Sequence, residues 1–321
     1  MKTFPTLNKA YNSVFVPNRL SIGLVMPITA YPNTVSPAMD CHLERARLAD
    51  SLGFAALWLR DVPFNVPSFG DTGQIFDPFV YLGVLSAVTE NIALGTGSII
   101  LPLRHPAHVA KAATSVDLLS GGRLLLGIAS GDRPEEYPAL NMTFPDRGAR
   151  FRESVAFIRA MAEDYPSIEN AHGTLSGGID MLPKPTGHRL PLLITGGSQQ
   201  APDWIAQNGD GWITYPRDAA AQARVIAAYR TGVKTKGLPA KPVMQSLYID
   251  LLEDPTAEPR PIHLGFASGL DFLRQYLTQL QAIGVNHVAL NLRFNQADID
   301  QTMFTLAQTL LPDFGNAKDI S

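Results

Sequence analysis

The chain of 321 residues contains almost no cysteine, and Cys41 is the only one. A single cysteine excludes a disulfide within the chain and fits a reducing compartment, so we expect a cytoplasmic protein. Cys41 falls within a pattern of apolar residues that is typical of a helix. Because free cysteines are mostly buried, we expect Cys41 to be a buried packing residue.

The chain also lacks long hydrophobic runs and strong charge. No apolar stretch reaches the roughly 18 residues that a membrane-spanning helix needs, so we expect no membrane association. Residues 1–19 contain neither a continuous apolar core nor a small-residue cleavage site, which predicts no signal peptide. The net charge of −3 and the lack of a basic cluster argue against nucleic acid as a partner.

Several catalytic signatures are missing from the sequence. There is no HExxH motif and no cluster of Cys and His, so we predict no metal site. There is no GxSxG elbow and no P-loop, and Gly95 and Gly97 lie inside an expected strand and not in a dinucleotide-binding turn. Without a metal or an obvious nucleophile, redox chemistry on an organic cofactor is the simplest interpretation.

The sequence is rich in alternating apolar strands and helices, with 45% hydrophobic residues. Eight strands, each followed by a helix, predict an α/β fold, a (β/α)8 TIM barrel formed by one domain over residues 1–321. A doubly wound sheet is the competing architecture, but it rarely needs eight such units. We expect strands at residues 20–26, 54–59, 92–101, 123–129, 190–195, 211–214, 242–251 and 285–292. We expect helices at residues 38–52, 78–89, 105–120, 149–164, 199–208, 219–235, 268–283 and 296–311.

Two segments fall outside the eight units. Residues 1–19 form an N-terminal extension that we expect to pack across the bottom or the side of the barrel. Residues 165–189 form an insertion before the fifth strand, rich in Gly and Pro, with a possible hairpin at residues 173–182. Three extended loops follow strands, at residues 60–77, 130–148 and 253–267. Long loops are usually functional, so we expect the site at the carboxyl ends of the strands.

One candidate site is the turn formed by Gly196, Gly197 and Ser198. It ends the expected fifth strand and opens a helix, where free N–H groups can hold a phosphate. The alternative is that Ser198 only caps this helix. Arg150 begins another helix, where a cation is unfavourable unless an anion is near. Its alternative is a surface ion pair with Glu153 or Asp146.

Further polar residues and glycines lie at other strand ends. Gly97 and Ser98 interrupt an apolar strand, which indicates either the close approach of a ligand or tight packing in the barrel. Asp61 could orient a ligand or act as a base, or it could pair with Arg60 or another arginine. The remaining candidates at these ends are Arg104, Ser130 and Gly131.

Four segments together resemble the bacterial luciferase-like flavin monooxygenases. They are FAALWL at residues 54–59, LGTGS at 94–98 with LPLRHP at 101–106, LSGGR at 119–123 and GDGWI at 209–213. The likeness runs from about Leu20 to Leu311. The resemblance implies a (β/α)8 barrel that binds flavin mononucleotide (FMN) or the deazaflavin coenzyme and oxidises a small organic molecule, often with a separate flavin reductase.

The resemblance also implies roles for individual residues. Gly97 and Ser98 match the bulge under the flavin ring, which is often a non-prolyl cis peptide. Gly196, Gly197 and Ser198 match the phosphate-binding turn, and Arg150 matches a phosphate-binding arginine. Ser130, next to Gly131, takes the place of a second arginine in luciferase.

Two departures from luciferase are visible. Asp61 is followed by Val62 and Pro63, with no histidine, and Ala129 takes the place of the reactive cysteine. We therefore expect neither light emission nor long-chain aldehyde chemistry.

The leading hypothesis is a flavin-dependent oxidoreductase, a monooxygenase using reduced FMN and O2, with Asp61 and Arg104 as catalytic residues near the reactive edge of the flavin. We expect a homodimer. The alternatives are a deazaflavin-dependent oxidoreductase, a flavin-binding protein without turnover, and a sugar-phosphate enzyme with Asp61 as base.

Overall fold

Eight parallel strands form a closed ring in the computed structural model, which describes residues 3–315. Each strand is hydrogen-bonded to the next, and the last strand pairs with the first. The predicted (β/α)8 barrel is therefore confirmed. The ring consists of β1 (Ser21–Val25), β2 (Ala56–Leu59), β3 (Ala93–Thr96) with its continuation β4 (Ile99–Ile100), β5 (Leu124–Ala129), β8 (Leu192–Thr195), β9 (Gly211–Thr214), β10 (Val243–Leu251) and β13 (His287–Asn291).

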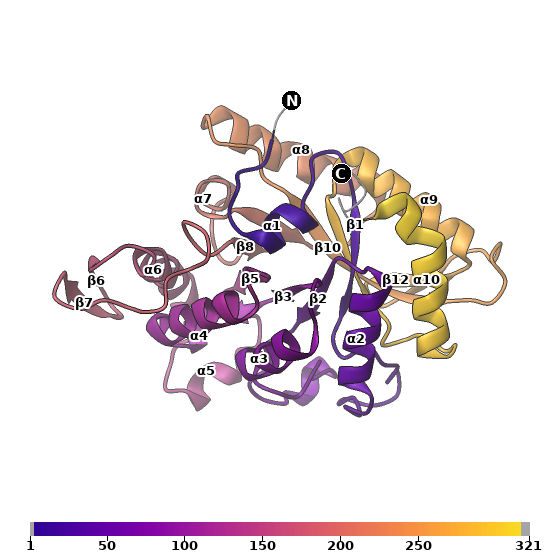
Figure 1. Cartoon of the computed structure of the whole chain (residues 1–321), viewed down its shortest axis with the longest axis horizontal. Helices are drawn as coiled ribbons and strands as arrows, with labels where there is room; N and C mark the ends of the chain where they lie inside the picture. Colours follow the sequence, from indigo (N-terminus) through magenta and orange to yellow (C-terminus); the bar gives the residue numbers. More distant parts are fainter. Residues whose placement is uncertain (1–2, 316–321) are drawn as a thin grey trace.

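Eight helices surround the strands (Figure 1). Local signals set several of their ends: Asp77, Asp218 and Asp298 accept N–H groups of the first turn, while Gly53 and Gly284 end helices with positive φ. The helices are α2 (His42–Leu52), α3 (Pro78–Val88), α4 (Pro106–Leu119), α6 (Arg147–Ala160), α7 (Pro202–Asn208), α8 (Ala219–Thr235), α9 (Leu270–Ile283) and α10 (Ile299–Phe314).

The third barrel strand is broken in two where one continuous strand was expected. The ladder stops after Thr96, resumes at Ile99 and then enters a short 3-10 turn, η2 (Leu101–Leu103). Between the two pieces the Gly97–Ser98 peptide bond is cis, as the resemblance implies. This break directs Gly97 and Ser98 to the interior at the carboxyl end of the barrel.

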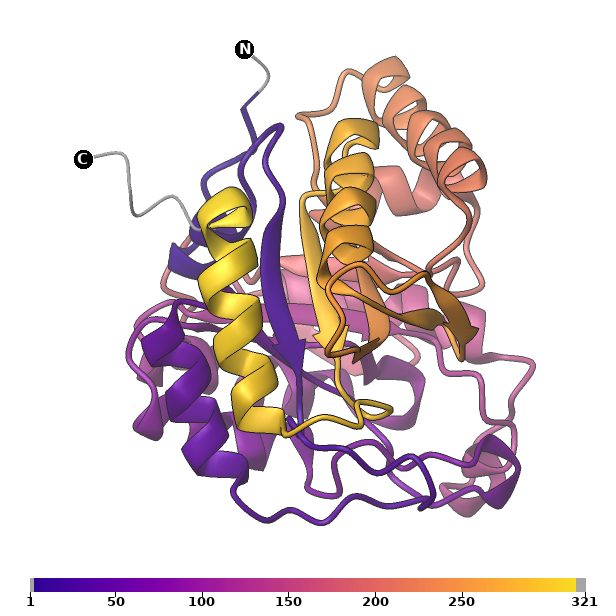
Figure 2. The ribbon, with the colours of Figure 1, turned by 90° about the vertical axis from the view of Figure 1, so that its right-hand side faces the viewer.

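The N-terminal extension closes the amino end of the barrel, as expected. It contains the short helix α1 (Lys9–Val14), and Tyr11, Val14 and Phe15 pack against side chains of the barrel interior such as Met244. The Tyr11 hydroxyl donates to the carbonyl oxygen of Asp210 at 2.8 Å. Figure 2 shows α1 at the end from which the strands start, with the long loops gathered at the other end.

The insertion and the long loops carry structure of their own. A hairpin on the outside of the barrel joins β6 (Ser167–Asn170) to β7 (Gly173–Ser176), so the hairpin predicted at residues 173–182 starts too late (Figure 1). A second hairpin, β11 (Arg260–Ile262) with β12 (Gly265–Ser268), was not predicted. The other two long loops contain η1 (Pro67–Phe69) and α5 (Glu136–Ala139).

The expectation for Cys41 is wrong. The helix expected from residue 38 begins at His42, and Cys41 is the exposed residue before it, with a φ of 56°. Within residues 3–315, no helix has both the length and the apolar character needed to cross a membrane.

Candidate functional site

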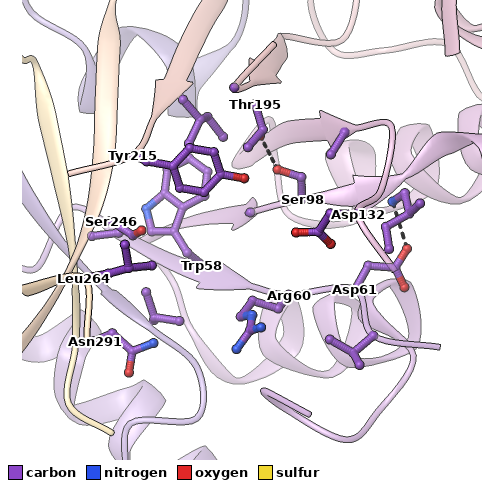
Figure 3. A pocket seen from close by; sticks show the side chains of 18 of the residues that line it. Trp58, Arg60, Asp61, Ser98, Asp132, Thr195, Tyr215, Ser246, Leu264 and Asn291 are labelled. Atoms are coloured by element: carbon purple, nitrogen blue, oxygen red, sulfur yellow. Dashed lines mark hydrogen bonds between the residues drawn. The ribbon is translucent and has the colours of Figure 1, made fainter. Parts of the chain in front are cut away.

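A cavity of about 650 Å³ opens at the carboxyl ends of the strands (Figure 3). Most of the predicted site residues line it together, although they come from four different strand ends. They are Asp61, Gly97, Ser98, Ser130, Gly131, Gly196, Gly197 and Ser198. Two predicted residues, Arg104 and Arg150, are not part of the lining.

The turn after β8 presents its N–H groups without the help of a helix. Gly196, Ser198 and Gln199 all have positive φ angles, a conformation that points successive N–H groups into one concavity. Within residues 3–315, no protein acceptor receives the N–H of Gly197, Ser198 or Gln199. The space beside Gly197 is open, since a Cβ there would have no neighbour within 4 Å. The turn is therefore a ready-made site for an anion.

The predicted helix N-terminus at this turn is wrong. Helix α7 begins at Pro202, and Ala201 is its N-cap. Ser198 does not cap it, because its hydroxyl donates to the carbonyl of Thr195 at 2.7 Å. The turn is instead held from β9, since the indole N–H of Trp212 donates to the Gly196 carbonyl at 2.9 Å.

Gly97 and Ser98 form part of the cavity wall beside the end of β8, the strand that leads into this turn. The Gly97 N–H donates to the Leu59 carbonyl at 2.7 Å, and the Ser98 hydroxyl is hydrogen-bonded to that of Thr195 (Figure 3). A Cβ at Gly97 would meet only the Trp58 ring, at 3.9 Å. The backbone here is thus both fixed and accessible to a flat ligand.

Asp61 forms an ion pair with Arg104, one of the two alternatives weighed from the sequence. Arg104 Nε donates to Asp61 Oδ2 at 3.0 Å and Arg104 Nη2 donates to Asp61 Oδ1 at 2.8 Å. The Ile100 N–H also donates to Asp61 Oδ2, at 3.1 Å, and Arg104 pairs further with Asp77. Both carboxylate oxygens of Asp61 are therefore engaged, and Asp61 anchors the backbone that follows Ser98.

Arg150 lies on α6, where its Nε donates to the carbonyl of Pro102 at 3.4 Å. In the described part of the chain it makes no ion pair with Glu153 or Asp146. Ser130 and Gly131 are in the cavity wall, and the Tyr137 hydroxyl donates to the Ser130 carbonyl. A side chain at Gly131 would collide with Ile100 at 2.7 Å and with Tyr137, and φ there is 77°.

A buried hydrogen-bond chain under the cavity was not predicted. The indole N–H of Trp58 donates to His287 Nε2 at 2.8 Å, so Nδ1 carries the proton and donates to the Ser21 hydroxyl at 2.7 Å. Ser21 in turn donates to the Val14 carbonyl in α1. Burial lowers the pKa of His287 to about 3, which keeps the ring neutral. Trp58 is thereby fixed in the cavity floor, 2% exposed.

Glycines on the neighbouring strands leave room for the side chains of Trp58 and His287. A Cβ at Gly95 would lie 2.5 Å from the Trp58 ring, and a Cβ at Gly23 would lie 2.8 Å from His287 Nε2. The only sign of this hydrogen-bond chain in the sequence was His287, a polar residue at the start of an otherwise apolar strand.

A second missed feature is an ion cluster on the cavity wall. Asp71 Oδ2 accepts a hydrogen bond from Arg60 at 2.5 Å and forms an ion pair with Arg293 Nη1 at 2.9 Å. Asp71 Oδ1 accepts from the Gly73 N–H at 2.8 Å and from the Tyr31 hydroxyl at 3.3 Å. Burial would raise the pKa of Asp71, but Arg60, the Gly73 N–H and Arg293 hold it below its usual range.

A family model described as luciferase-like monooxygenase matches residues 14–284. The chain belongs to this family. Among curated relatives of this luciferase-like protein, an uncharacterised protein of Mycobacterium bovis is 31% identical over 226 residues, covering 63% of this chain and 80% of that protein. The F420-dependent hydroxymycolic acid dehydrogenase of Mycobacterium tuberculosis is 27% identical over 202 residues, covering 62% of this chain and 55% of that enzyme.

Solved structures of other luciferase-like proteins share the fold. The monooxygenase RslO1 of Streptomyces bottropensis has a TM-score of 0.77 at 20% identity, covering 91% of this chain and 99% of that one. An F420-dependent secondary alcohol dehydrogenase with an F420-acetone adduct has a TM-score of 0.75 at 16% identity, covering 91% and 98%. The oxygenating component of the 3,6-diketocamphane monooxygenase of Pseudomonas putida, in complex with FMN, has a TM-score of 0.73 at 14% identity, covering 92% and 99%.

Proposed function

We propose that this luciferase-like protein is a flavin-dependent monooxygenase that uses reduced FMN and O2 on a small organic substrate. The observation that carries the proposal is the turn at Gly197, Ser198 and Gln199, whose three N–H groups face the cavity side of the barrel without protein acceptors. Such a cradle suits the phosphate of FMN, and the cavity of about 650 Å³ is within the usual size of cofactor sites.

The chain's own residues bind and orient the cofactor in this proposal. The turn after β8 holds the phosphate, while Gly97, Ser98 and the Trp58 indole form the floor on which the ring system lies. Bound reduced flavin supplies two electrons, so that one oxygen atom of O2 enters the substrate and the other leaves as water with two protons. A separate flavin reductase would provide the reduced flavin.

Asp61 and Arg104 act in this proposal as positioning residues. The paired carboxylate of Asp61 fixes the Ile100 N–H and hence the backbone after Ser98. Because Arg104 and the Ile100 N–H engage both carboxylate oxygens, we assign Asp61 to holding this backbone in place and not to moving a proton. Arg150 lies outside the cavity lining, and in this proposal it only donates a hydrogen bond to the Pro102 carbonyl.

The deazaflavin coenzyme is the second candidate cofactor, because one curated relative and one structural neighbour are named as F420-dependent. It also carries a phosphate, so the same turn would bind it. A deazaflavin enzyme would transfer a hydride and would not use O2.

The experiment is a binding titration of the purified protein with FMN, riboflavin and the deazaflavin coenzyme, followed by ligand fluorescence. We expect riboflavin, which lacks the phosphate, to bind at least about tenfold more weakly than FMN. Gly197→Asp places a carboxylate at the phosphate position in open space and should weaken FMN binding by about 100-fold or more.

Gly178→Asp is the matched control. Gly178 is also surrounded by open space but lies in the insertion, far from the cavity lining, and its variant should bind FMN as the wild type does. Unchanged FMN affinity in Gly197→Asp would remove the turn from the site. Failure of all three flavins to bind would overturn the proposal itself.

A further inference from the structure

The cavity has a positively charged side that the flavin proposal does not use. Arg60 and Arg293 both form ion pairs with the single carboxylate of Asp71, so two cations share one anion. Figure 3 shows the Arg60 side chain between Asn291 and Asp61, with Asp132 between it and Ser98. Asp71 alone therefore does not neutralise both guanidinium groups.

The two arginines differ in how fully their donors are used. Arg293 also donates from Nη2 to the carbonyls of Thr34 and Gly70, at 3.2 and 2.9 Å, and its guanidinium lies over the Tyr31 ring. Arg293 therefore serves to hold two loops together. The Arg60 side chain donates one hydrogen bond within residues 3–315, to Asp71, although a guanidinium has five N–H donors.

Arg60 is also the more accessible of the two. Its side chain is 25% exposed, against 10% for that of Arg293, and it lines the cavity. A guanidinium partly removed from water gains most from an oxygen-rich anion that accepts two parallel hydrogen bonds. Its remaining donors and its charge are thus available to a molecule in the cavity.

We propose that Arg60 binds a carboxylate of the substrate, so that the enzyme acts on small organic acids. This inference rests on the proposed function, since it names the substrate class of the same cavity. The carboxylate accepts two hydrogen bonds from the free edge of the Arg60 guanidinium.

Asn291 supplies a second donor on the same side. Its Oδ1 accepts from the Arg293 N–H at 3.0 Å, which turns Nδ2 into the free end of the amide, and the described residues give Nδ2 no acceptor. Asn291 also lines the cavity. Asn291 therefore offers a neutral donor in the same cavity as the Arg60 cation.

A negative charge lies on the Ser98 side of Arg60. Asp132 projects into the cavity near Ser98 in Figure 3, and it forms no ion pair within the described part of the chain. A carboxylate is repelled from Asp132 and attracted to Arg60. This polarity directs the rest of the substrate from Arg60 toward Ser98, where the flavin ring is proposed to lie.

The test compares benzoate with benzamide, which have nearly the same shape but differ in charge. Calorimetric titrations would be run on the protein with and without FMN. We expect benzoate to bind at least about tenfold more tightly than benzamide. Arg60→Gln should weaken benzoate by about tenfold or more and leave benzamide unchanged, whereas Arg60→Lys should fall between, because lysine keeps the charge but not the paired donors.

Arg60→Gln is expected to fold, because Asp71 keeps its ion pair with Arg293. Arg45→Gln is the matched control: Arg45 pairs with Asp300 outside the barrel and is absent from the cavity lining. If Arg60→Gln does not fold, the intermediate affinity expected for Arg60→Lys decides the question.

Equal affinities for benzoate and benzamide, or benzoate affinity unchanged by both Arg60 variants, would overturn the inference. So would benzoate binding that is lost in Gly197→Asp and not in Arg60→Gln, because benzoate would then occupy the anion turn. The titration without FMN separates the two proposals. If the protein fails to bind FMN but binds benzoate in a way that depends on Arg60, the proposed cofactor is wrong and the proposed carboxylate site stands.

Discussion

The two ends of the barrel treat their polar groups in opposite ways. At the amino end, where α1 closes the barrel, Asp210 accepts from Arg159 and Arg189, each at 2.6 Å, and from the Leu192 N–H at 2.9 Å. At the carboxyl end, Arg60 has donors to spare and Glu136 is buried without a hydrogen-bond partner in the described residues. The carboxylate of Asp210 is paired within the protein, whereas Arg60 keeps donors that face the cavity.

This contrast separates stability from chemistry along the barrel axis. Buried polar groups that have partners stabilise the fold, while those without partners cost free energy. A ligand that supplies the missing partners recovers that cost on binding. The amino end should therefore be sensitive to mutation in unfolding experiments, and the carboxyl end should be sensitive in binding experiments.

The largest effect on stability is expected from a substitution at the amino end of the barrel. Asp210→Ala leaves Arg159 without its buried counter-ion and should lower the free energy of unfolding by about 3–5 kcal/mol, measured by urea denaturation. Asp132→Ala, the same substitution in the exposed wall of the cavity, should change it by less than about 0.5 kcal/mol. Similar losses of unfolding free energy in the two variants would show that the two ends of the barrel do not differ in this way.

A smaller effect is expected where the two ends meet. His287→Leu removes the acceptor of the buried Trp58 N–H and should cost about 1–3 kcal/mol at neutral pH. Burial lowers the pKa of His287 to about 3, whereas histidine titrates near 6.5 in the unfolded chain. The wild type therefore loses stability through His287 as pH falls from about 6.5 toward 3, and the leucine variant lacks this contribution.

Urea denaturation at several pH values checks this prediction. The deficit of His287→Leu relative to the wild type should shrink from pH 7 to pH 4. A deficit that stays constant over this range would show that folding does not lower the pKa of His287.

The smallest effect is expected at the carboxyl end. Burial raises the pKa of Glu136 to about 7, although Arg133 acts in the opposite direction. A raised carboxyl pKa means that the wild type loses stability as pH rises from about 4.5 to about 7. Glu136→Gln cannot titrate, so its melting temperature should gain on the wild type between pH 5 and pH 8. If the melting temperatures of the two proteins change in parallel with pH across this range, Glu136 is not a neutral buried acid in the folded protein.

Local periodicity was enough to predict most of the fold. The bounds of β9 and α8 agree with the predicted ranges residue for residue, because apolar spacing, Gly209 and the Asp218 cap are all encoded within the segment. The hairpin of β11 and β12 was missed because its strands are three and four residues long. Its main anchor is the distant strand β10, which no local pattern reveals.

The candidate site was predictable only in part. Strand ends brought Gly97, Ser98 and the turn at Gly196–Ser198 together, since parallel strands direct their carboxyl ends to one face. The pairs Trp58 with His287 and Asp71 with Arg293 join residues more than 200 positions apart, so one sequence gives no sign of them. The local sequence likewise did not show that the Arg150 side chain contacts the Pro102 carbonyl.

The length of β10 decides which part of the cavity can adapt to a ligand. Its first residues pair with β9 and β13, and residues 248–251 pair with β12, which extends the barrel's own ladder beyond the rim. A lone hairpin is marginally stable in water, but here β12 shares the ladder with β10, so the β12 amides should exchange with solvent as slowly as those of the barrel. His263 and Leu264, at the tip of that hairpin, are therefore a fixed template, and adjustment to different ligands falls to the irregular loops at residues 60–77 and 130–148.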